Sequence, residues 1–310
     1  MTYEEMLYSL LDTDERIIIM TSENRAAMRK LSAEVKDRFI DVGIAEQTMI
    51  GMAAGLALRG RIPLVHALSS FLTMRAFEFI RTDVGLGNLA VKLVGAAAGF
   101  LSEANGPTHQ AVEDISLMRG IPNMNIFCPA DEEDLLAGIK EVFLSPNPFY
   151  VRYNNMKPSV SHKKGFKIGK AEVISEGNDA TILTYGILLG QAEEAASILR
   201  GQGLSVGVVN LRTLKPIDRD LIIKVCNRSS IVVALEDHFR TGGLFSILGE
   251  IVLEEELNCK VRSISLENRW FKPALLNNVL VYEKFTGEAI AAEIYRLLEN
   301  SSHINSKYYF

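Results

Sequence analysis

Cysteine is scarce in this chain, and its placement excludes two classes of site. The 310 residues contain three cysteines, Cys128, Cys226 and Cys259, which lie far apart and form no C-x-x-C pair or Cys/His metal spacing. Three scattered thiols argue against a disulfide framework and fit a reducing compartment. We therefore expect a cytoplasmic protein without structural cross-links.

Long apolar runs and an excess of basic residues are also missing. No stretch approaches the roughly 20 apolar residues that cross a bilayer, and the acidic, helix-like start MTYEEMLYSLLDTDER does not resemble a secretory signal. The net charge of −5 provides no basic surface of the kind that binds nucleic acid or anionic membranes. These absences predict a protein with no nucleic-acid partner and no membrane attachment.

The nucleotide-binding and metal-binding motifs of many enzymes are absent as well. The chain has no G-x-x-x-x-G-K-[ST], no G-x-G-x-x-G after a strand, and no H-E-x-x-H or clustered Asp/Glu/His set. The glycines of Thr241–Gly243 have neither spacing, and we interpret this triplet as a turn that opens a helix. The sequence therefore predicts no metal site on this chain and no obvious cradle for a phosphate.

What is present indicates an α/β protein of two domains. Apolar residues make up 48% and charged residues 23% of the chain, as in ordinary globular proteins, and the length suits about two domains. Short β-rich runs alternate with helical patterns, which indicates parallel sheets covered on both faces. We expect two doubly wound domains in series, at 1–157 and 173–310, joined by a polar linker at 158–172. The expected strands are 17–20, 38–42, 63–68, 90–96, 124–130, 149–153, 180–186, 205–211, 230–236 and 261–267, and the expected helices are 46–59, 73–86, 111–119, 132–144, 188–202, 218–226, 244–257 and 286–299.

One expected helix combines a carboxylate at its start with unusually small residues. In RFIDVGIAEQTMIGMAAGLAL (38–58), Glu46 follows a glycine turn, and alanine and glycine recur along the helix. Small side chains allow another element to approach closely. An acidic group at a helix start is also stabilised by the macrodipole, and this stretch taken alone slightly favours that explanation.

Six segments, taken in order, carry a resemblance to a known family. They are DVGIAEQ (41–47), SSFLTMRAFEFIR (69–81), NGPTHQAVEDISLMRGIPNM (105–124), CPADEEDLL (128–136), LRTLKPIDRDLI (211–222) and ALEDHFRTGG (234–243). Their order and spacing resemble the transketolase family of thiamine diphosphate enzymes, in the half that holds the pyrimidine-binding and C-terminal domains. Single motifs such as GIAEQ are weakly specific, whereas the ordered set covers nearly the whole chain and is highly specific.

The resemblance implies a catalytic role for Glu46. In the family, a glutamate at this position hydrogen-bonds N1′ of the aminopyrimidine and favours the imino tautomer, whose nitrogen removes the C2 proton of the thiazolium. A carboxyl group does this well when it is partly desolvated and held on a rigid element. With the resemblance counted, the catalytic interpretation of Glu46 is favoured over the macrodipole one.

The resemblance assigns further residues to the cofactor and substrate. Phe71 matches the aromatic wall for the aminopyrimidine, and Met74 and Phe77 are expected to contact the cofactor beside it, although ordinary helix-core packing fits Phe77 equally well. His109 in GPTHQ matches the histidine that hydrogen-bonds substrate oxygens and moves protons near the reacting carbonyl. His66 matches no role in the family, and we expect it to pack in the core.

The resemblance also implies that this chain is half of an enzyme. Family members hold the diphosphate through Mg²⁺ on a separate domain with a GDG motif followed by Asn, and GDG does not occur here. The chain begins almost at the pyrimidine domain, which fits the split form of the family. We expect the Mg²⁺ ligands on an N-terminal partner subunit, in an α2β2 assembly with additional self-contacts. The charged strand end at 236–238 resembles a subunit-contact region, with a solvated loop as the alternative.

Three departures from the family fall where substrate is handled. Ala97 stands about where transketolases have a histidine that contacts the donor hydroxyl, and Asn105 replaces an aspartate that reads donor stereochemistry. Asn154 and Asn155 follow the strand FYVRY, and the arginine that grips a sugar phosphate in relatives is displaced to Arg152. Asparagine cannot replace a charged bidentate contact. We expect Ala97, Asn105, Arg152, Asn155 and His109 to bind substrate, with cofactor activation preserved and substrate choice altered.

These observations support one leading function and two alternatives. The leading one is a transferase subunit of a split transketolase-like carboligase in carbohydrate metabolism, which moves a two-carbon ketol or acyl unit from a keto donor to an aldehyde or ketone acceptor. The first alternative is a β-type subunit of a pyruvate- or 2-oxo acid-using thiamine enzyme, which shares the fold. The second is a non-catalytic scaffold, against which the retained Glu46 and His109 weigh.

Overall fold

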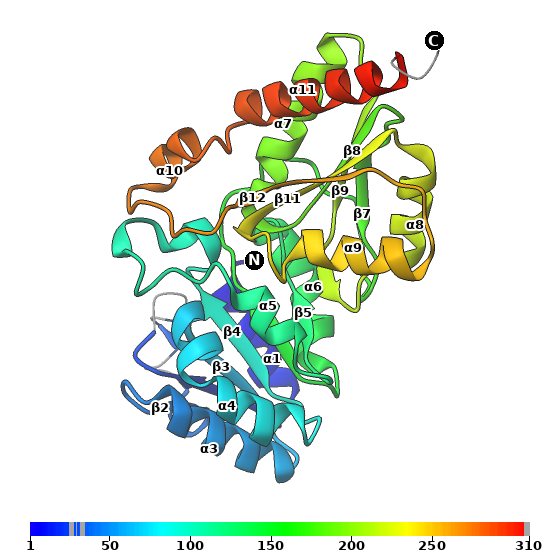
Figure 1. Ribbon diagram of the computed structural model, residues 1–310. Coiled ribbons are helices and arrows are strands. Elements are labelled where there is room, and N and C mark those ends of the chain that lie inside the picture. The colour runs from blue at the N-terminus through cyan, green and yellow to red at the C-terminus, as the bar shows by residue number, and fades with distance from the viewer. Residues whose placement is uncertain (25–27, 29, 32–34, 307–310) are drawn as a thin grey trace.

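The structure, a computed structural model, confirms two doubly wound α/β units in series. It describes residues 1–24, 28, 30–31 and 35–306. Figure 1 shows the first half of the chain, in blue to green, below the second half, in green to red. In the described part of the chain, no helix is both long enough and apolar enough to cross a membrane.

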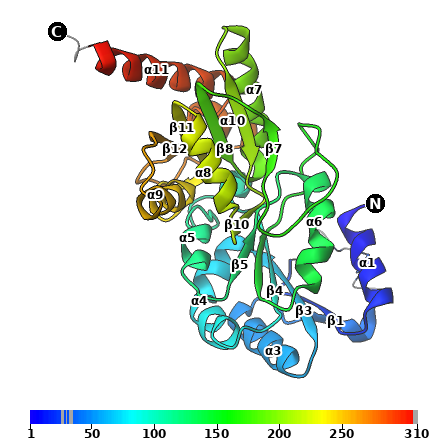
Figure 2. The ribbon, with the colours of Figure 1, turned by 90° about the vertical axis from the view of Figure 1, so that its right-hand side faces the viewer.

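The first unit is built on a seven-stranded sheet in the order β10-β5-β6-β4-β3-β1-β2, in which only β10 runs antiparallel. Alternate residues of one strand face opposite layers: Ile17 and Ile19 pack with Leu7 and Leu135, whereas Met20 packs with Met49 on the other face. Figure 2 shows these layers, with α1 and α6 on one side of the sheet and α3 and α4 on the other. The strands are β1 (Ile17–Thr21), β2 (Phe39–Asp41), β3 (Ile62–Leu68), β4 (Lys92–Ala96), β5 (Asn125–Phe127), β6 (Phe149–Arg152) and β10 (Thr213–Lys215).

The helical segments of the first unit cover both faces of this sheet (Figure 2). They are α1 (Tyr3–Thr13), η1 (Lys36–Arg38), α3 (Glu46–Leu58), η2 (Phe71–Arg75), α4 (Phe77–Phe79), η3 (Ile80–Gly85), η4 (Gly99–Asn105), α5 (Asp114–Arg119) and α6 (Glu132–Leu144).

The second unit is a five-stranded sheet in the order β12-β11-β8-β9-β7, in which only β7 is antiparallel. Helices α7 and α11 pack against each other on one face, and α8 and α9 lie on the other. The strands are β7 (Glu172–Ser175), β8 (Ala180–Thr184), β9 (Val206–Asn210), β11 (Ile231–Phe239) and β12 (Val261–Leu266), and the helices are η5 (Gly186–Leu188), α7 (Leu189–Gly201), α8 (Arg219–Arg228), α9 (Leu244–Glu254), α10 (Leu276–Tyr282) and α11 (Gly287–Ser306).

The two units are joined more closely than a linker alone would join them. Strand β10 belongs to the second half of the sequence, yet it pairs with β5 at the edge of the first sheet. Leu214 on β10 and Tyr185 after β8 lie in the same hydrophobic cluster as Ile126 and Met118 of the first unit. The domain boundaries expected at 157 and 172 stay a prediction. These shared contacts connect residues on either side of them.

The helix expected at 73–86 differs in kind from a regular α-helix. Its two longer parts, η2 and η3, are π-helical, and a short α-helical piece, α4, separates them. π-helical turns are rare and frequently lie at functional sites. The extra residue in each π-turn widens the helix next to α3, where the candidate site lies.

Candidate active site

Glu46 is buried at the first turn of α3. Its side chain is 2% exposed, and the preceding Gly43 has a φ of 69°, in the left-handed region that glycine adopts easily. Ser22 fixes this turn, since its hydroxyl donates to the Gly43 carbonyl and accepts from the Ala45 N–H. The sequence at the helix start therefore places a carboxylate in a desolvated position on a rigid element, as the catalytic interpretation requires.

A chain of contacts leads from this carboxylate through two residues of η2 to the loop that carries His109. Arg75 Nη1 donates to Glu46 Oε2 at 2.9 Å, and the Arg75 guanidinium carbon lies 4.0 Å from the centroid of the Phe71 ring. The Phe71 ring is in turn 5.2 Å from the His109 imidazole, between centroids. The structure thus brings Glu46, Phe71 and His109 into one continuous chain of contacts.

Arg75 is the residue that the sequence interpretation missed. It lies within the segment SSFLTMRAFEFIR, four residues after Phe71, and this spacing places two side chains on one face of a helix. Met74 beside it is 36% exposed, and Phe77 is half-buried and packs against the main hydrophobic cluster. The packing of Phe77 agrees with the helix-core alternative, and its contact with the cofactor, like that of Met74, stays a prediction.

The loop that carries His109 is held in place by the second unit. Asp237 Oδ2 accepts from the Phe100 N–H at 3.2 Å, and Gln110 Nε2 donates to the Phe271 carbonyl at 2.9 Å. Gly99 is required at the start of this loop, because an added Cβ would lie 1.9 Å from Asp237 Oδ2. The C-terminal unit therefore determines where the imidazole of His109 is presented.

Arg152 is buried and paired with one aspartate from each unit. Its side chain is 5% exposed, with Nε 3.0 Å from Asp114 Oδ2 and Nη1 hydrogen-bonded to Asp237. Burial raises the pKa of the Asp237 carboxyl, and the charge of Arg152 opposes that rise. Removing one partner of such a buried pair leaves an uncompensated charge. Because both aspartates hold this guanidinium, the contacts favour a structural role for Arg152, and its expected contact with substrate stays a prediction.

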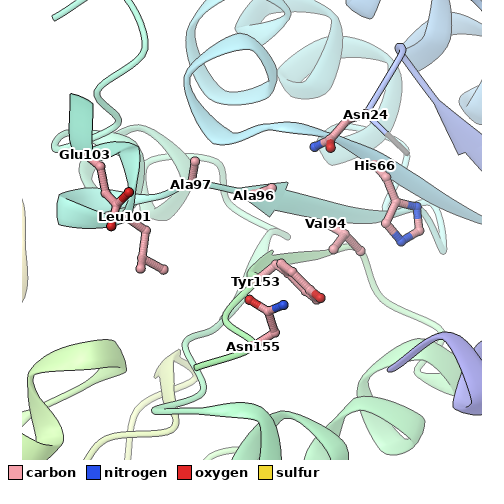
Figure 3. Close-up of a pocket in the computed structure, with 9 residues that line it drawn as sticks. All are labelled: Asn24, His66, Val94, Ala96, Ala97, Leu101, Glu103, Tyr153 and Asn155. Atoms are coloured by element: carbon pink, nitrogen blue, oxygen red, sulfur yellow. The ribbon is translucent and has the colours of Figure 1, made fainter. Parts of the chain in front are cut away.

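A cavity of about 340 Å³ opens at the carboxyl ends of β3, β4 and β6. Ligands of open α/β sheets bind in the crevice outside this edge. Ala97 and Asn155, both expected at the substrate, line the cavity, while Asn105 is exposed outside its lining. Figure 3 shows Glu103 and Leu101 at one end of the cavity and His66 at the other.

His66 was expected in the core, and it is buried, but it also forms a wall of this cavity. Tyr3 lies 2.8 Å from His66 Nε2, and the Leu64 carbonyl lies 3.1 Å from Nδ1. Burial lowers the pKa of His66 to about 4, so the ring is neutral at physiological pH. It then donates from Nδ1 to the Leu64 carbonyl and accepts from the Tyr3 hydroxyl at Nε2, so the His66 side chain adds no charge to the cavity wall.

A second buried polar cluster lies at the junction of the two units. The ligand atoms of Asp134, His162 and Glu172 all lie within 4.8 Å of one another. Arg212 already occupies the cluster, with Nε 2.7 Å from Asp134 Oδ1 and Nη2 2.9 Å from Glu172 Oε2. Both ring nitrogens of His162 are hydrogen-bonded, to Glu172 and Asp131. The arrangement is a buried ion-pair network.

Comparison with known proteins agrees with this geometry. Residues 1–158 match the family model described as the transketolase pyrimidine binding domain, and residues 169–290 match the transketolase C-terminal domain. The chain is 37% identical to the 6-deoxy-6-sulfo-D-fructose transketolase subunit SqwH of Clostridium sp. (strain MSTE9), over 84% of this chain and 81% of that protein. It is 33% identical to the putative transketolase C-terminal section of Methanocaldococcus jannaschii, over 94% and 93%.

A solved structure extends this likeness to three dimensions. It is described as a split gene transketolase in the form of an inactive beta4 tetramer, and it shares 31% identity with this chain at a TM-score of 0.85, over 96% of each chain. Enzymes of this family depend on thiamine diphosphate. The two family models together cover most of the sequence, and the relatives match over most of their length. The chain therefore belongs to the transketolase family and comprises its pyrimidine-binding and C-terminal domains.

Proposed function

We propose that this chain is the pyrimidine-binding subunit of a split, two-chain transketolase-like transferase. The complete enzyme moves a two-carbon ketol or acyl unit from a keto donor to an aldehyde or ketone acceptor. The observation that carries the proposal is the buried Glu46 carboxylate, which shares one set of contacts with the Phe71 ring and the His109 imidazole.

The residues present suit the aminopyrimidine end of thiamine diphosphate. That ring is planar and rich in nitrogen, so it needs a hydrogen-bonding carboxyl group on its edge and an aromatic surface on its face. Arg75 has a planar group of the same kind and makes both contacts, with Glu46 and with Phe71. When bound, thiamine diphosphate supplies a carbon nucleophile that attacks carbonyl compounds.

Each residue of the site has a distinct task in this proposal. Glu46 hydrogen-bonds a ring nitrogen, and its burial strengthens that interaction because the local dielectric is low. Phe71 positions the ring by stacking and keeps water from one face. His109, whose Nδ1 lies 2.9 Å from the Thr108 hydroxyl, hydrogen-bonds substrate oxygens and moves a proton at the reacting carbonyl.

The diphosphate and Mg²⁺ are proposed to lie on a partner subunit with a GDG motif and a downstream Asn, since this sequence contains no GDG. The surface around Glu46 supports a partner there. Ile44, two residues before Glu46, is 71% exposed and Met52 on α3 is 41% exposed, and a partner subunit that covers them would bury this apolar surface. We propose an α2β2 assembly, with self-contacts between copies of this chain, in the cytoplasm.

Substrate is proposed to enter the cavity beside this site. Ala97 and Asn155 line the cavity, and Asn105 is proposed to reach the substrate from the exposed end of the same loop. The missing histidine at Ala97 and the engaged Arg152 both support a choice of substrate different from that of ordinary transketolases. The Clostridium relative, whose name describes a sulfo-sugar transketolase subunit, supports altered substrate choice in this branch.

Reconstitution tests the proposal directly. This chain should copurify with the partner subunit and bind thiamine diphosphate and Mg²⁺ tightly only as the complex, as isothermal titration measures. Tight cofactor binding by this chain alone would contradict the shared site. Assays with a ketose and with pyruvate as donor then separate the leading function from the pyruvate-using alternative, and full turnover by a Glu46→Ala complex would support the scaffold alternative.

A further inference from the structure

A carboxylate stands at one end of the cavity that receives the substrate in the proposed function. Glu103 lines this cavity together with Ala97, Tyr153 and Asn155. Figure 3 shows Glu103 beside Leu101, at the end opposite His66. Glu103 is not among the residues proposed to activate the cofactor. The contacts that link Glu46, Phe71 and His109 do not include it.

The backbone of Glu103 is held in a conformation that most residues avoid. Its φ is 44° and its ψ is −120°, a region that glycine adopts easily and that other residues adopt at a cost. Loop residues with such backbone values persist where the surrounding structure holds them, and they gather at ligand sites. We therefore expect the contacts of the Glu103 side chain to supply the interaction that offsets this backbone cost.

The side chain of Glu103 is anchored by the other half of the protein. Its Oε1 accepts the N–H of Leu276, the first residue of α10, at 3.2 Å. A carboxylate has two oxygens and about four acceptor positions, so one hydrogen bond leaves acceptor capacity for a ligand. The anchor holds the charge at the cavity end and limits the entropy lost when a ligand binds.

The described side chains that line the cavity with Glu103 carry no positive charge that would offset the charge of its carboxylate. Among the described residues that line the cavity, none is an arginine or a lysine. Burial and the nearby Glu132 raise the pKa of Tyr153 to about 12, so its hydroxyl is neutral, and the neighbouring Asn155 offers an uncharged amide. Hydroxyl and amide groups form hydrogen bonds with sugar hydroxyls. A carboxylate in addition accepts strong hydrogen bonds from O–H and N–H donors.

We propose that Glu103 determines substrate choice at its end of the cavity. Its carboxylate accepts hydrogen bonds from the hydroxyls of an uncharged sugar chain or from the ammonium of an amine-bearing one. It disfavours a phosphate or another anion at that point, because like charges repel in a site of low dielectric. This inference rests on the proposed function only in assigning the cavity to the substrate.

Binding of three matched polyols to the reconstituted, cofactor-loaded complex tests the inference. The probes are D-glucitol, 1-amino-1-deoxy-D-glucitol and D-glucitol 6-phosphate, each measured by isothermal titration. Wild type should bind the amine most tightly and the phosphate least tightly. Glu103→Gln keeps the size and the acceptor for Leu276, so we expect it to lower the amine-to-phosphate affinity ratio by about tenfold or more.

Two further variants make the result specific. Glu103→Asp keeps the charge and should keep the order of the probes, whereas Glu133→Gln removes an exposed first-turn carboxylate of α6 and should change nothing. An unchanged ratio in Glu103→Gln, or equal effects of Gln and Asp, would overturn the inference.

Deuterium exchange at C2 of the cofactor, followed by NMR in the same samples, separates this inference from the proposed function. If C2 exchange is normal and the amine-to-phosphate affinity ratio is unchanged in Glu103→Gln, only the role of Glu103 is refuted. If wild type shows no C2 exchange but the affinity ratio changes as expected, only the proposed function is refuted.

Discussion

Arg75 donates to the buried carboxylate of Glu46 at 2.9 Å while its guanidinium lies 4.0 Å above the ring of Phe71. It therefore occupies both contacts that a planar nitrogen heterocycle would make here. The Arg75 side chain is 43% exposed, so solvent screens its end of the ion pair. The pair can therefore open at small cost when a better ligand arrives.

Replacing Arg75 tests whether it competes with the cofactor. Arg75→Ala should tighten binding of thiamine diphosphate to the complex by about two- to fivefold, the range that corresponds to a surface ion pair of up to about 1 kcal/mol. Isothermal titration measures the change, and Arg81→Ala, an exposed arginine of η3, serves as the control. Weaker binding in Arg75→Ala would show that this arginine helps to hold the cofactor.

Gly99 should be intolerant of a side chain. Gly99→Ala places a Cβ 1.9 Å from Asp237 Oδ2 at a residue with φ of 55°, so we expect the free energy of unfolding to fall by about 2–4 kcal/mol. Urea denaturation measures this change. Gly249→Ala is the matched control, because an added Cβ in α9 meets nothing within 4 Å and should stabilise the helix by up to about 1 kcal/mol. Equal stabilities of the two variants would refute this account of the loop.

His162 should make stability depend on pH in a defined direction. Burial lowers its pKa, but hydrogen bonds to Asp131 and Glu172 outweigh burial and raise the pKa to about 10. A raised folded-state pKa gives a contribution that is complete below the unfolded value of about 6.5. That contribution is lost as pH rises through about 10.

The difference in free energy of unfolding between wild type and His162→Gln should therefore be larger at pH 6 than at pH 9.5. Urea titrations at the two pH values measure it, and Lys157→Gln, an exposed residue of the same segment, should show no such trend. A difference independent of pH would mean that the imidazole is neutral in the folded protein.

The sequence predicted those parts of the fold that depend on local pattern. The apolar run Ile17–Met20 identified a buried strand because both faces of a parallel sheet are covered. The resemblance to the family identified Glu46, Phe71 and His109 as site residues, and the structure connects all three through contacts. The strand needed only residues close in sequence, whereas the site residues needed the ordered set of six segments along the chain.

The parts that the sequence did not predict depend on distant residues or on fine geometry. Arg152 is held by Asp237, which lies 85 residues away, so nothing in the strand FYVRY indicates that its guanidinium is already occupied. Strand β10 has only three residues, too few for a pattern. The π-helical turns η2 and η3 follow an apolar pattern that also suits an α-helix, so only the backbone distinguishes them.

The central claim is that the buried Glu46 carboxyl activates a cofactor whose diphosphate is held by another chain. Exchange of the cofactor C2 hydrogen with deuterium, followed by NMR in the reconstituted complex, tests this claim without any substrate. We expect Glu46→Gln to slow exchange by about 100-fold or more, as loss of a positioned acid–base group does, while Glu133→Gln at the start of α6 leaves the rate unchanged. Wild-type exchange rates in Glu46→Gln would contradict the account.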